Sequence, residues 1–357
     1  MKIIINDYGC YPFILQLAKS LAQRNHMINY MYAPFIQNPM ANYKDLKPNK
    51  NFSFQSVKIK GVYNKYNFFL RRNQEIEYGN KCWNRVIKIN PDVIICANMP
   101  LDALKILVER SKNYKIPLIL WVQDIYSEAI KKVLSKKSFL LSKPVFWYYS
   151  RIENYCIQHS KKIIAITSDF QKYFKDQERS KFTVIENWGV QHNKANENIK
   201  KKWKKKLKLN KEFVFLYSGT LSYKHDPEIF LKLSENFKDS KIIIFSEGKF
   251  AVNLKKKSIT HKNLIVKKWV NLNEFQSILS LADVLLVSLS KDASEFSVPS
   301  KILNYFYSAK PILGMMPRQN LASKKIIGLK AGYIVEPGHF DVFLNKAIKL
   351  YKNKSIR

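Results

Sequence analysis

The sequence lacks long apolar runs, although it has 357 residues. No apolar stretch approaches the roughly 18–20 residues that a helix needs to cross a bilayer. The N-terminus reaches polar residues after one short strand-like run, so it has no apolar core of the kind found in signal peptides. Because neither signal is present, we expect the protein to be cytoplasmic.

Cysteines are also few. The four of them, Cys10, Cys82, Cys96 and Cys156, lie far apart and show no paired spacing typical of zinc or redox sites. We therefore expect free thiols, buried or partly exposed. No Asp-x-Asp motif occurs in a suitable loop, so the sequence predicts no metal and no cofactor.

Acidic residues are scarce relative to basic ones. The chain has 62 Lys and Arg against 27 Asp and Glu, which gives a net charge of +35. Such an excess suits an anionic partner, whether nucleic acid, a phosphorylated small molecule or an acidic membrane. Abundant Lys, Asn and Ile also fit an AT-rich genome that places Lys at solvated positions. The lysines are spread along the chain and form no recognised nucleic-acid-binding motif, so nucleic-acid binding is a remote alternative.

What the chain does have is a regular alternation of strand-like apolar runs and amphipathic helical segments. This alternation is typical of βαβ units and predicts an α/β fold with two doubly wound parallel sheets. The strands of the first sheet are expected at 2–6, 27–33, 93–97, 117–121, 163–166 and 182–185. Those of the second are expected at 214–217, 241–245, 265–268, 284–288, 311–314 and 332–335.

The length also exceeds that of one typical core, so we expect two domains. The alternation stops after residue 188, and a polar, lysine-rich stretch follows. We predict an N-terminal domain at 1–188, a linker at 189–211 that continues into the next domain's first helix, and a C-terminal domain at 212–357. Ligands of open α/β sheets bind at the carboxyl ends of strands, so the site is expected in the loops there.

Several strand-to-helix corners of the second half carry candidate ligand-binding residues. At the first, Gly219 permits a tight turn and Lys224 precedes a helix, a pattern that suits an anion. At the second, Glu247 and Gly248 close a strand, and the carboxylate could accept a hydrogen bond from a ribose hydroxyl or a base edge. Each of these corners is equally explained as an ordinary turn.

The most specific corner is EFSVPSKILNYFYSAKPIL at 295–313. Ser300 is expected to cap a helix that begins at Lys301. A Lys in the first turn opposes the helix dipole, and a bound diphosphate would reverse that penalty. We therefore expect Lys301 to contact phosphate rather than to be a solvated surface residue. At the last corner, Glu336 precedes Pro337 and Gly338. The turn alone explains the proline and the glycine, so only Glu336 suggests a function there.

Taken together, SGT…KH, EG, VPSK…AKP and GYIVEPG resemble the donor domain of the retaining glycosyltransferase family 4. The likeness is greatest to bacterial members that build O-antigen, colanic-acid and capsule-like polysaccharides. INDYGCYPF, ANMPLDA, LILWVQDIY, IIAITSDF and VIENW follow in family order, so the resemblance covers nearly the whole chain. It implies the GT-B fold, with the acceptor in the N-terminal domain and the nucleotide-sugar in the C-terminal domain, facing a cleft.

The resemblance also implies roles for particular residues. Gly9 is similar to the glycine near the donor phosphates, and Gln123 and Asp124 occupy the place of the family's catalytic His-Asp. Lys224 and Lys301 resemble the cations on the diphosphate, which Gly219 and Ser300 also approach. Glu247, Gly248, Glu336 and Asn304 match positions around the nucleotide and sugar.

Three departures from the family pattern matter. The family's pair of glutamates is not intact, because the second falls at Asn304 and the first at Phe296, one residue after Glu295. Gln123 replaces the usual His, which argues against a titrating group there. The chain ends at Arg357, so we expect the family's C-terminal crossing helix to be lacking.

A basic and aromatic segment suggests where the protein works. Between Lys131 and Lys162 lie eight Lys or Arg residues and one acid, Glu153, interleaved with aromatic and aliphatic residues. Such a segment could lie on an anionic bilayer and make the protein a peripheral membrane protein. Equally, it could be a core helix with solvated lysines.

We therefore expect a retaining glycosyltransferase of cell-surface polysaccharide synthesis. Its donor would be a nucleoside-diphosphate sugar of UDP or GDP type, and its acceptor a lipid-linked or saccharide molecule. The alternatives are a nucleotide-sugar epimerase or an inactive homologue of the same fold.

Overall fold

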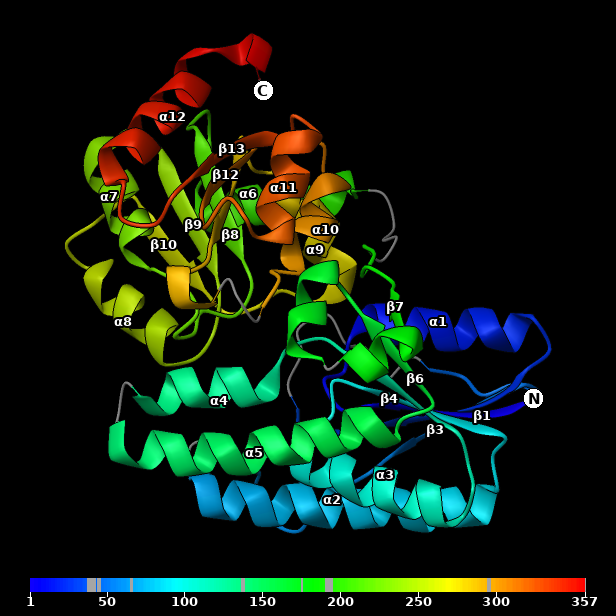
Figure 1. Cartoon of the computed structure of the whole chain (residues 1–357). Helices are drawn as coiled ribbons and strands as arrows, with labels where there is room; N and C mark the ends of the chain where they lie inside the picture. Colours follow the sequence, from blue (N-terminus) through cyan, green and yellow to red (C-terminus); the bar gives the residue numbers. More distant parts are fainter. Residues whose placement is uncertain are drawn as a thin grey trace. The chain divides into compact units, whose positions relative to one another are not determined.

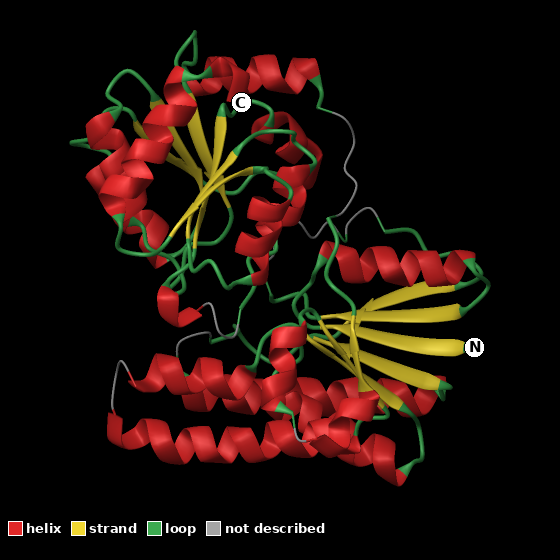
Figure 2. Ribbon diagram, turned by 45° about the horizontal axis from the view of Figure 1, so that its top comes forward, coloured by secondary structure: helices red, strands yellow, loops and turns green. Residues whose placement is uncertain are grey.

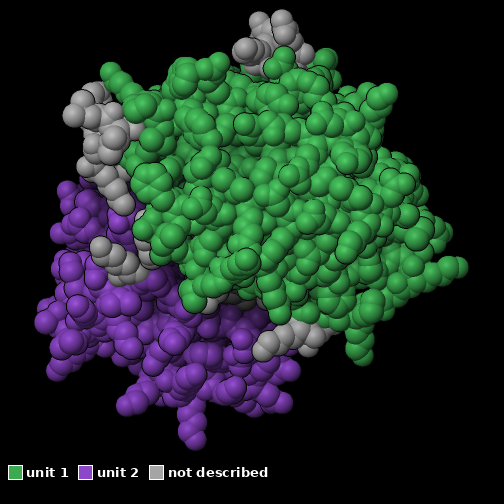
Figure 3. Space-filling view, turned by 90° about the horizontal axis from the view of Figure 1, so that it is seen from below, with its two compact units in different colours: residues 1–188 green, residues 189–357 purple. Residues whose placement is uncertain are grey.

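The computed structural model covers the chain and describes residues 1–36, 43, 46–64, 67–135, 139–174, 176–189, 195–293 and 297–356. The chain divides into two compact units, Met1–Trp188 and Gly189–Arg357 (Figure 3). No helix in the described ranges is long and apolar enough to span a membrane.

Unit 1 is built on a seven-stranded parallel sheet of order β3-β2-β1-β4-β5-β6-β7 (Figure 1). The central strands have side chains buried on both faces, which is why they read as continuous apolar runs such as VIICA in β4. The strands are β1 (Lys2–Asp7), β2 (Met27–Tyr32), β3 (Phe52–Ser56), β4 (Val93–Ala97), β5 (Leu118–Val122), β6 (Lys162–Ala165) and β7 (Phe182–Val184).

Helices cover both faces of this sheet. In Figures 1 and 2, α1 (Pro12–Gln23) lies on one face and α2, α3 and α5 lie on the other. These are α2 (Phe68–Ile89), α3 (Leu101–Asn113) and α5 (Phe139–His159), with α4 (Tyr126–Ser135) packed along α5 and two 3-10 turns, η1 (Ser168–Tyr173) and η2 (Asp176–Lys181), before β7.

Unit 2 repeats the plan with six parallel strands in the order β10-β9-β8-β11-β12-β13. Its strands are β8 (Val214–Ser218), β9 (Lys241–Phe245), β10 (Leu264–Lys267), β11 (Val284–Ser288), β12 (Ile312–Met315) and β13 (Gly332–Val335). Its helices are α6 (Glu197–Leu207), α7 (Glu228–Asn236), α8 (Lys249–Lys257), α9 (Leu272–Leu279), α10 (Lys301–Phe306), α11 (Leu321–Gly328) and α12 (Phe340–Lys352), with 3-10 turns η3 (Lys291–Ala293) and η4 (Lys354–Ile356).

The two-sheet α/β fold predicted from the sequence is confirmed. Each predicted strand is present within one or two residues, and β3 is the one that was missed. Its first residue, Phe52, also forms a bridge with Asn49, and its FSFQS sequence is short and half polar, so the apolar pattern gave no clear signal. All four cysteines are free and buried, as expected.

Part of the predicted linker is a folded element of unit 2. Helix α6 begins at Glu197, with the Asn196 side chain accepting hydrogen bonds from two backbone N–H groups of its first turn. Its buried residues are Trp203 and Leu207, and the Trp203 ring lies 5.4 Å from that of Phe245 in β9. The linker was expected to continue into the first helix of the next domain, and α6 is that helix; its sequence is lysine-rich because only two of its side chains enter the core. Residues 190–194 lie outside the described ranges.

Candidate functional site

Both sheets place a topological switch point at the centre of their strand order. In unit 1 it lies between β1 and β4, and in unit 2 between β8 and β11. The chain leaves these neighbouring strands in opposite directions, which opens a crevice at their carboxyl ends. The candidate residues Gly9 and Gly219 come just after β1 and β8, so both lie at these crevices.

In unit 2 the side chain of Lys301 reaches back from α10 to the end of β8. A Cβ added to Gly219, whose φ is +142°, would lie 3.0 Å from both Cε and Nζ of Lys301. The Nζ lies 3.7 Å from the centroid of the Tyr217 ring and donates a hydrogen bond to its hydroxyl. Glycine suits this position because its φ would strain any other residue, and a side chain there would also displace the flexible end of Lys301.

The charge of Lys301 has no acidic partner in the described part of the chain. None of the ion pairs found there includes it, and burial lowers the pKa of its ammonium group to about 7. A buried cation without a counter-ion is costly, and a bound anion would remove that cost. A negatively charged group bound at this corner would therefore supply the counter-ion that the described residues do not.

Two neighbouring residues add a second cation and a neutral hydrogen-bond donor to this corner. Lys224 Nζ donates to the Ser297 hydroxyl at 3.0 Å. His225 accepts a hydrogen bond at Nδ1 from the Ser222 backbone N–H at 3.1 Å, so a neutral ring carries its proton on Nε2. Burial, and next the charges of Lys301 and Lys224, hold the pKa of His225 well below its usual value. The site therefore combines two lysines with a neutral imidazole donor.

The prediction that Ser300 caps α10 is wrong. Ser300 has φ −63° and ψ −19°, a helical conformation, and its side chain makes no cap hydrogen bond. A capping serine normally needs an extended backbone to direct its hydroxyl to the following N–H groups. Three residues after Lys301, Asn304 has a buried Oδ1 that lacks a hydrogen-bond partner in the described ranges. Glu295 and Phe296, which precede α10, lie outside those ranges.

The second corner lies beside the first. The Leu221 N–H, just after Gly219, donates to the Ser246 hydroxyl at the end of β9 at 3.1 Å. Gly248 immediately precedes α8 and has φ +96°, and a Cβ there would lie 4.0 Å from the Leu221 carbonyl oxygen. Glu247 thus follows β9 next to the Gly219 corner.

Glu336 has a local structural role. Its Oε1 accepts a hydrogen bond from the Arg318 backbone N–H at 2.8 Å, which ties the loop after β12 to the end of β13. No described contact joins Glu336 to Lys224 or Lys301. A contact of Glu336 with the nucleotide or sugar therefore stays a prediction. The hydrogen bond that is observed stabilises the loop.

In unit 1 a polar network covers Gly9. A Cβ on Gly9 would lie 2.3 Å from Cε2 of Tyr11 and 2.8 Å from Nδ2 of Asn98. Asn98 Nδ2 donates to the Tyr11 hydroxyl at 3.2 Å, and the Tyr126 hydroxyl donates to Asn98 Oδ1 at 3.0 Å. Asn98 follows β4 in the ANMP motif, so its position at the switch point could have been found from the sequence.

The side-chain amide of Gln123 forms two hydrogen bonds with that of Asn187. Its Nε2 donates to Asn187 Oδ1 at 3.3 Å, and Asn187 Nδ2 donates to its Oε1 at 2.6 Å. The next residue, Trp188, donates from Nε1 to Gln16 at 2.8 Å and lies 5.9 Å from the Trp121 ring. Gln123 therefore anchors the end of unit 1 to β5.

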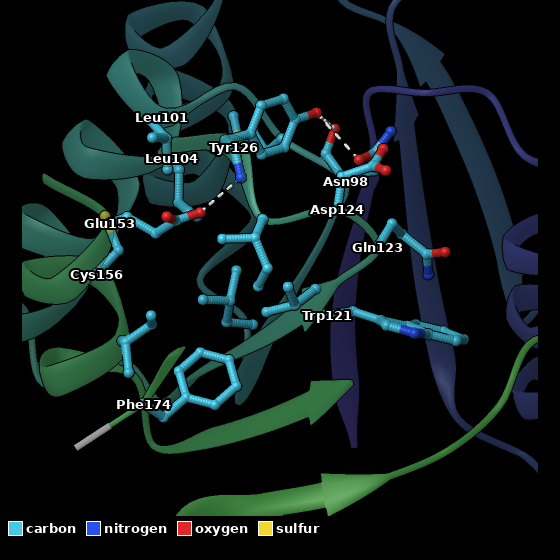
Figure 4. Close-up of a pocket in the computed structure, with 15 residues that line it drawn as sticks. Asn98, Leu101, Leu104, Trp121, Gln123, Asp124, Tyr126, Glu153, Cys156 and Phe174 are labelled. Carbon is cyan, nitrogen blue, oxygen red and sulfur yellow. Dashed lines mark hydrogen bonds between the residues drawn. The ribbon is translucent and has the colours of Figure 1, made fainter. Parts of the chain in front are cut away.

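Asp124 lies at the polar end of a narrow pocket. Figure 4 shows Asn98, Asp124 and Tyr126 gathered there, with Leu101, Leu104 and Phe174 forming apolar walls. Burial, and next the charge of Asp124, raise the pKa of the Tyr126 phenol well above its usual value. The free space is about 20 Å³, enough for one water molecule and too small for a sugar ring.

The last residue of β1, Asp7, is a buried acid that the sequence analysis did not single out. Asp7 is fully buried, and its Oδ2 accepts from the Tyr30 hydroxyl at 2.5 Å. Burial raises its pKa to about 7, against the effect of hydrogen bonds from Tyr30 and backbone groups. Its apolar flanks in IIIND made it look like an ordinary strand end. No group of three or more His, Cys, Asp or Glu side chains in the described ranges could hold a metal ion.

Solved structures with the same fold cover the whole chain. Anabaena HepE in complex with UDP and glucose has a TM-score of 0.70 at 14% identity, over 100% of this chain and 91% of that one. Sucrose-phosphate synthase from Thermosynechococcus elongatus gives 0.71 at 10% identity, over 98% and 90%. A putative UDP-N-acetylglucosamine 2-epimerase from Listeria monocytogenes gives 0.58 at 10% identity, over 100% and 89%.

These identities are low, so the likeness shows the fold alone. The two parallel-sheet α/β domains match those of the GT-B glycosyltransferase neighbours, which confirms the predicted α/β fold class. No protein-family model and no curated protein matches the sequence.

Proposed function

We propose that this chain is a glycosyltransferase that transfers a sugar from a nucleoside-diphosphate sugar. The observation that carries the proposal is the buried ammonium group of Lys301, held against Gly219 and Tyr217 with no described acid beside it. The fold neighbours include a protein in complex with UDP-glucose, and this supports a nucleotide-sugar as the anion.

The chemistry of such a site follows from its charges. In the transfer, the bond between the anomeric carbon and the β-phosphate oxygen breaks, and its electron pair stays on the diphosphate. Negative charge therefore grows where Lys301 and Lys224 lie, and fixed cations stabilise that charge without reorganising. The neutral His225 can add a hydrogen bond from Nε2.

We further propose transfer with retention, as the resemblance to family 4 implies. The acceptor oxygen would bond to the anomeric carbon on the face that the diphosphate leaves, and the acceptor's proton would pass to a phosphate oxygen. No dedicated base is needed for this step. The place of the family's second glutamate is taken by Asn304, whose unpartnered Oδ1 could accept a hydrogen bond from a sugar hydroxyl.

The acceptor side is proposed in unit 1. Asp124 and the Asn98 network lie at the carboxyl end of the sheet, where a polysaccharide or lipid-linked saccharide could bind. Gln123 is assigned a positioning role, because its amide already holds Asn187. The small volume of the pocket indicates that a sugar would bind over its mouth rather than inside it.

Nucleotide release from a panel of donors tests the proposal. The full chain is incubated with UDP-, GDP-, ADP- and dTDP-sugars, with and without acceptor extract, and free nucleoside diphosphate is measured. We expect release from one donor class, lost in Lys301→Ala and retained in Lys256→Ala, an exposed lysine of α8. Absence of release from every donor, or equal activity of both variants, would contradict it.

An epimerase is the second candidate, because one fold neighbour is a putative UDP-N-acetylglucosamine 2-epimerase. The same assay separates the two reactions. An epimerase converts one sugar into another, whereas a transferase moves the sugar onto an acceptor and leaves the nucleoside diphosphate behind.

A further inference from the structure

A hollow of about 660 Å³ lies in unit 1 at the amino ends of β5 and β6. It is at the opposite edge of the sheet from Gln123 and Asp124, which follow the carboxyl end of β5. This space is called the β5–β6 hollow below. Five lysines line it and no acid of the described ranges does; the lysines are Lys112, Lys115, Lys161, Lys162 and Lys181.

The fold brings these lysines together from three parts of the chain, which are the end of α3 with the turn after it, the start of β6 and the end of η2. Hydrogen bonds fix the first two parts against β5. The Ile116 N–H donates to the Ser111 carbonyl at 2.9 Å, and the Lys161 N–H donates to the Leu118 carbonyl at 2.8 Å. The cations therefore converge on a concave space, whereas the lysines of α6 follow one another along a single helix.

Helix ends account for only part of this positive charge. α3 and α5 both end at the hollow, and the C-terminus of a helix carries about half an elementary negative charge. Lys181 serves such an end, because its Nζ donates to the Gln158 carbonyl of α5 at 2.8 Å. The two helix ends together offset about one elementary charge. Most of the charge of the five lysines is therefore left over.

The side chains of the other four lysines have no ion pair and no hydrogen bond in the described ranges. Glu109, the acid of α3 that is closest in sequence to the hollow, pairs with Lys105 at 3.5 Å. Glu153 of α5 accepts from the Tyr126 and Ser127 backbone N–H groups. The acids of the two helices that end at the hollow are thus used elsewhere.

Two further side chains in the wall fit a bound anion. Ser111 is 2% exposed, and its hydroxyl lacks a hydrogen-bond partner in the described part of the chain. Buried polar groups are normally paired, so this donor is open to an oxyanion. His159 lies in the last turn of α5, and burial, and next the charges of Lys112 and Lys181, lower the pKa of its ring. Two of the lysines therefore act on one point of the wall.

We propose that the β5–β6 hollow binds a compact anion that carries three or more phosphate groups. Phosphate oxygens accept charge-assisted hydrogen bonds from lysine, and several linked phosphates engage several cations at once. The volume is that of a small-molecule site. No Phe, Tyr or Trp of the described ranges lines the hollow, so nothing there would stack on a nucleobase, and the phosphates are the part that is recognised.

This site is separate from the proposed donor site. Lys224 and Lys301 belong to unit 2, whereas every residue that lines the hollow belongs to unit 1. The inference does not rest on the transferase reaction, so either can fail without the other.

Nuclear magnetic resonance of the His159 ring in the full chain tests the inference, with the signals assigned by His159→Gln. We expect inorganic tripolyphosphate, added at constant ionic strength, to shift these signals and to raise the pKa of His159, because added negative charge favours the protonated ring. Orthophosphate should bind about tenfold more weakly or worse. ATP in parallel separates two sources of the phosphates. Equal affinity shows that the phosphate chain alone is bound, and tighter binding of ATP identifies a nucleoside triphosphate.

Matched double variants locate the site. Lys115→Ala with Lys161→Ala should weaken tripolyphosphate binding about tenfold or more. Lys201→Ala with Lys205→Ala, which removes two exposed lysines of α6, should leave it unchanged. In Lys301→Ala the His159 response should persist. Absence of that response in the wild type, its loss in Lys301→Ala, equal losses in both double variants, or orthophosphate binding as tight as that of tripolyphosphate would overturn the inference.

Discussion

At the scale of single residues, Lys301 is the predicted site residue whose ammonium group is buried with no described acidic partner. Its ammonium group is buried beside Gly219 and Tyr217 and shares the corner with Lys224. The sequence predicted both lysines from their place before helices, and it gave no signal for the Tyr217 ring beneath one of them. That contact depends on side-chain direction, which the motif does not encode.

We expect Lys301→Ala and Lys224→Ala each to weaken nucleoside-diphosphate binding. A hydrogen bond to a charged group contributes roughly 1.5–3 kcal/mol, so the loss should be about 10- to 150-fold. Isothermal titration calorimetry of the full chain measures it, with Lys256→Ala as the control. Unchanged affinity in both variants would remove the proposed phosphate site.

Donor binding should also depend on pH through Lys301. Burial lowers its pKa from 10.5 to about 7 in the empty site, and a bound diphosphate favours the charged form. Above pH 7 binding therefore has to take up a proton, and affinity should fall as pH rises, by up to about 50-fold between pH 7 and 9. Phosphate groups, with a second pKa near 6, stay ionised over that range.

For folding, the depressed pKa of Lys301 makes the free energy of unfolding rise with pH, which is the same sign as for an acid whose pKa is depressed in the folded state. The unfolded chain holds the Lys301 proton more tightly, so the cost is full below pH 7 and is relieved as pH rises towards 10.5. Lys301→Arg, which stays charged, should flatten the pH dependence of binding. A profile that is the same in the wild type and in this variant would contradict the assignment.

Asp124→Asn should lower turnover more than donor affinity, because Asp124 lies in unit 1 and the proposed phosphate site lies in unit 2. Steady-state kinetics with the active donor separates kcat from donor affinity. An intact turnover number would show that Asp124 only stabilises the loop after β5.

At the scale of elements, two glycines of unit 2 differ in whether the surrounding structure leaves room for a side chain. Gly332 begins β13, and a Cβ there would lie 1.8 Å from the Ile312 carbonyl oxygen of β12. Gly328 ends α11, and a Cβ there would meet nothing within 4 Å. These two glycines therefore form a matched pair four residues apart.

We expect Gly332→Ala to lower the free energy of unfolding by about 3 kcal/mol or more, because backbone would meet backbone. Gly328→Ala should be neutral or raise it by about 0.5–1 kcal/mol. Denaturant unfolding followed by circular dichroism measures both. Equal effects of the two changes would show that the β12–β13 pairing adapts freely.

The sequence predicted most elements because buried parallel strands are apolar on both faces and stand out as continuous runs. It missed β3, whose pattern is half polar, and it gave no bounds for α6, the helix into which the linker was expected to continue and which buries only Trp203 and Leu207. Gly219 was predicted from its place after a strand, and Asp124 from the resemblance to family 4. The Asn98–Tyr126 contact and the Gln123–Asn187 pair join distant segments, and local pattern holds no information on them.

At the scale of the whole molecule, each unit has its own sheet and core, so a ligand of one unit should protect that unit. We expect saturating UDP or GDP to slow hydrogen exchange in Gly189–Arg357 far more than in Met1–Trp188. At 100 times Kd, the stabilisation would be about 2.7 kcal/mol. Exchange followed by mass spectrometry, with ADP and dTDP in parallel, also identifies the base. Protection confined to the first unit would contradict the proposed donor site.

The lysines along β13 have a consequence for the protein in concentrated solution. β13 is an edge strand, and the hollow beside it is lined by Lys310, Lys330 and Lys346, with Lys346 Nζ 4.9 Å from the Tyr333 ring. An exposed edge can pair with the edge of another molecule and seed aggregates, and like charges keep two such edges apart. Part of the lysine excess thus keeps molecules apart by charge repulsion. Molar salt screens that repulsion and should therefore drive self-association.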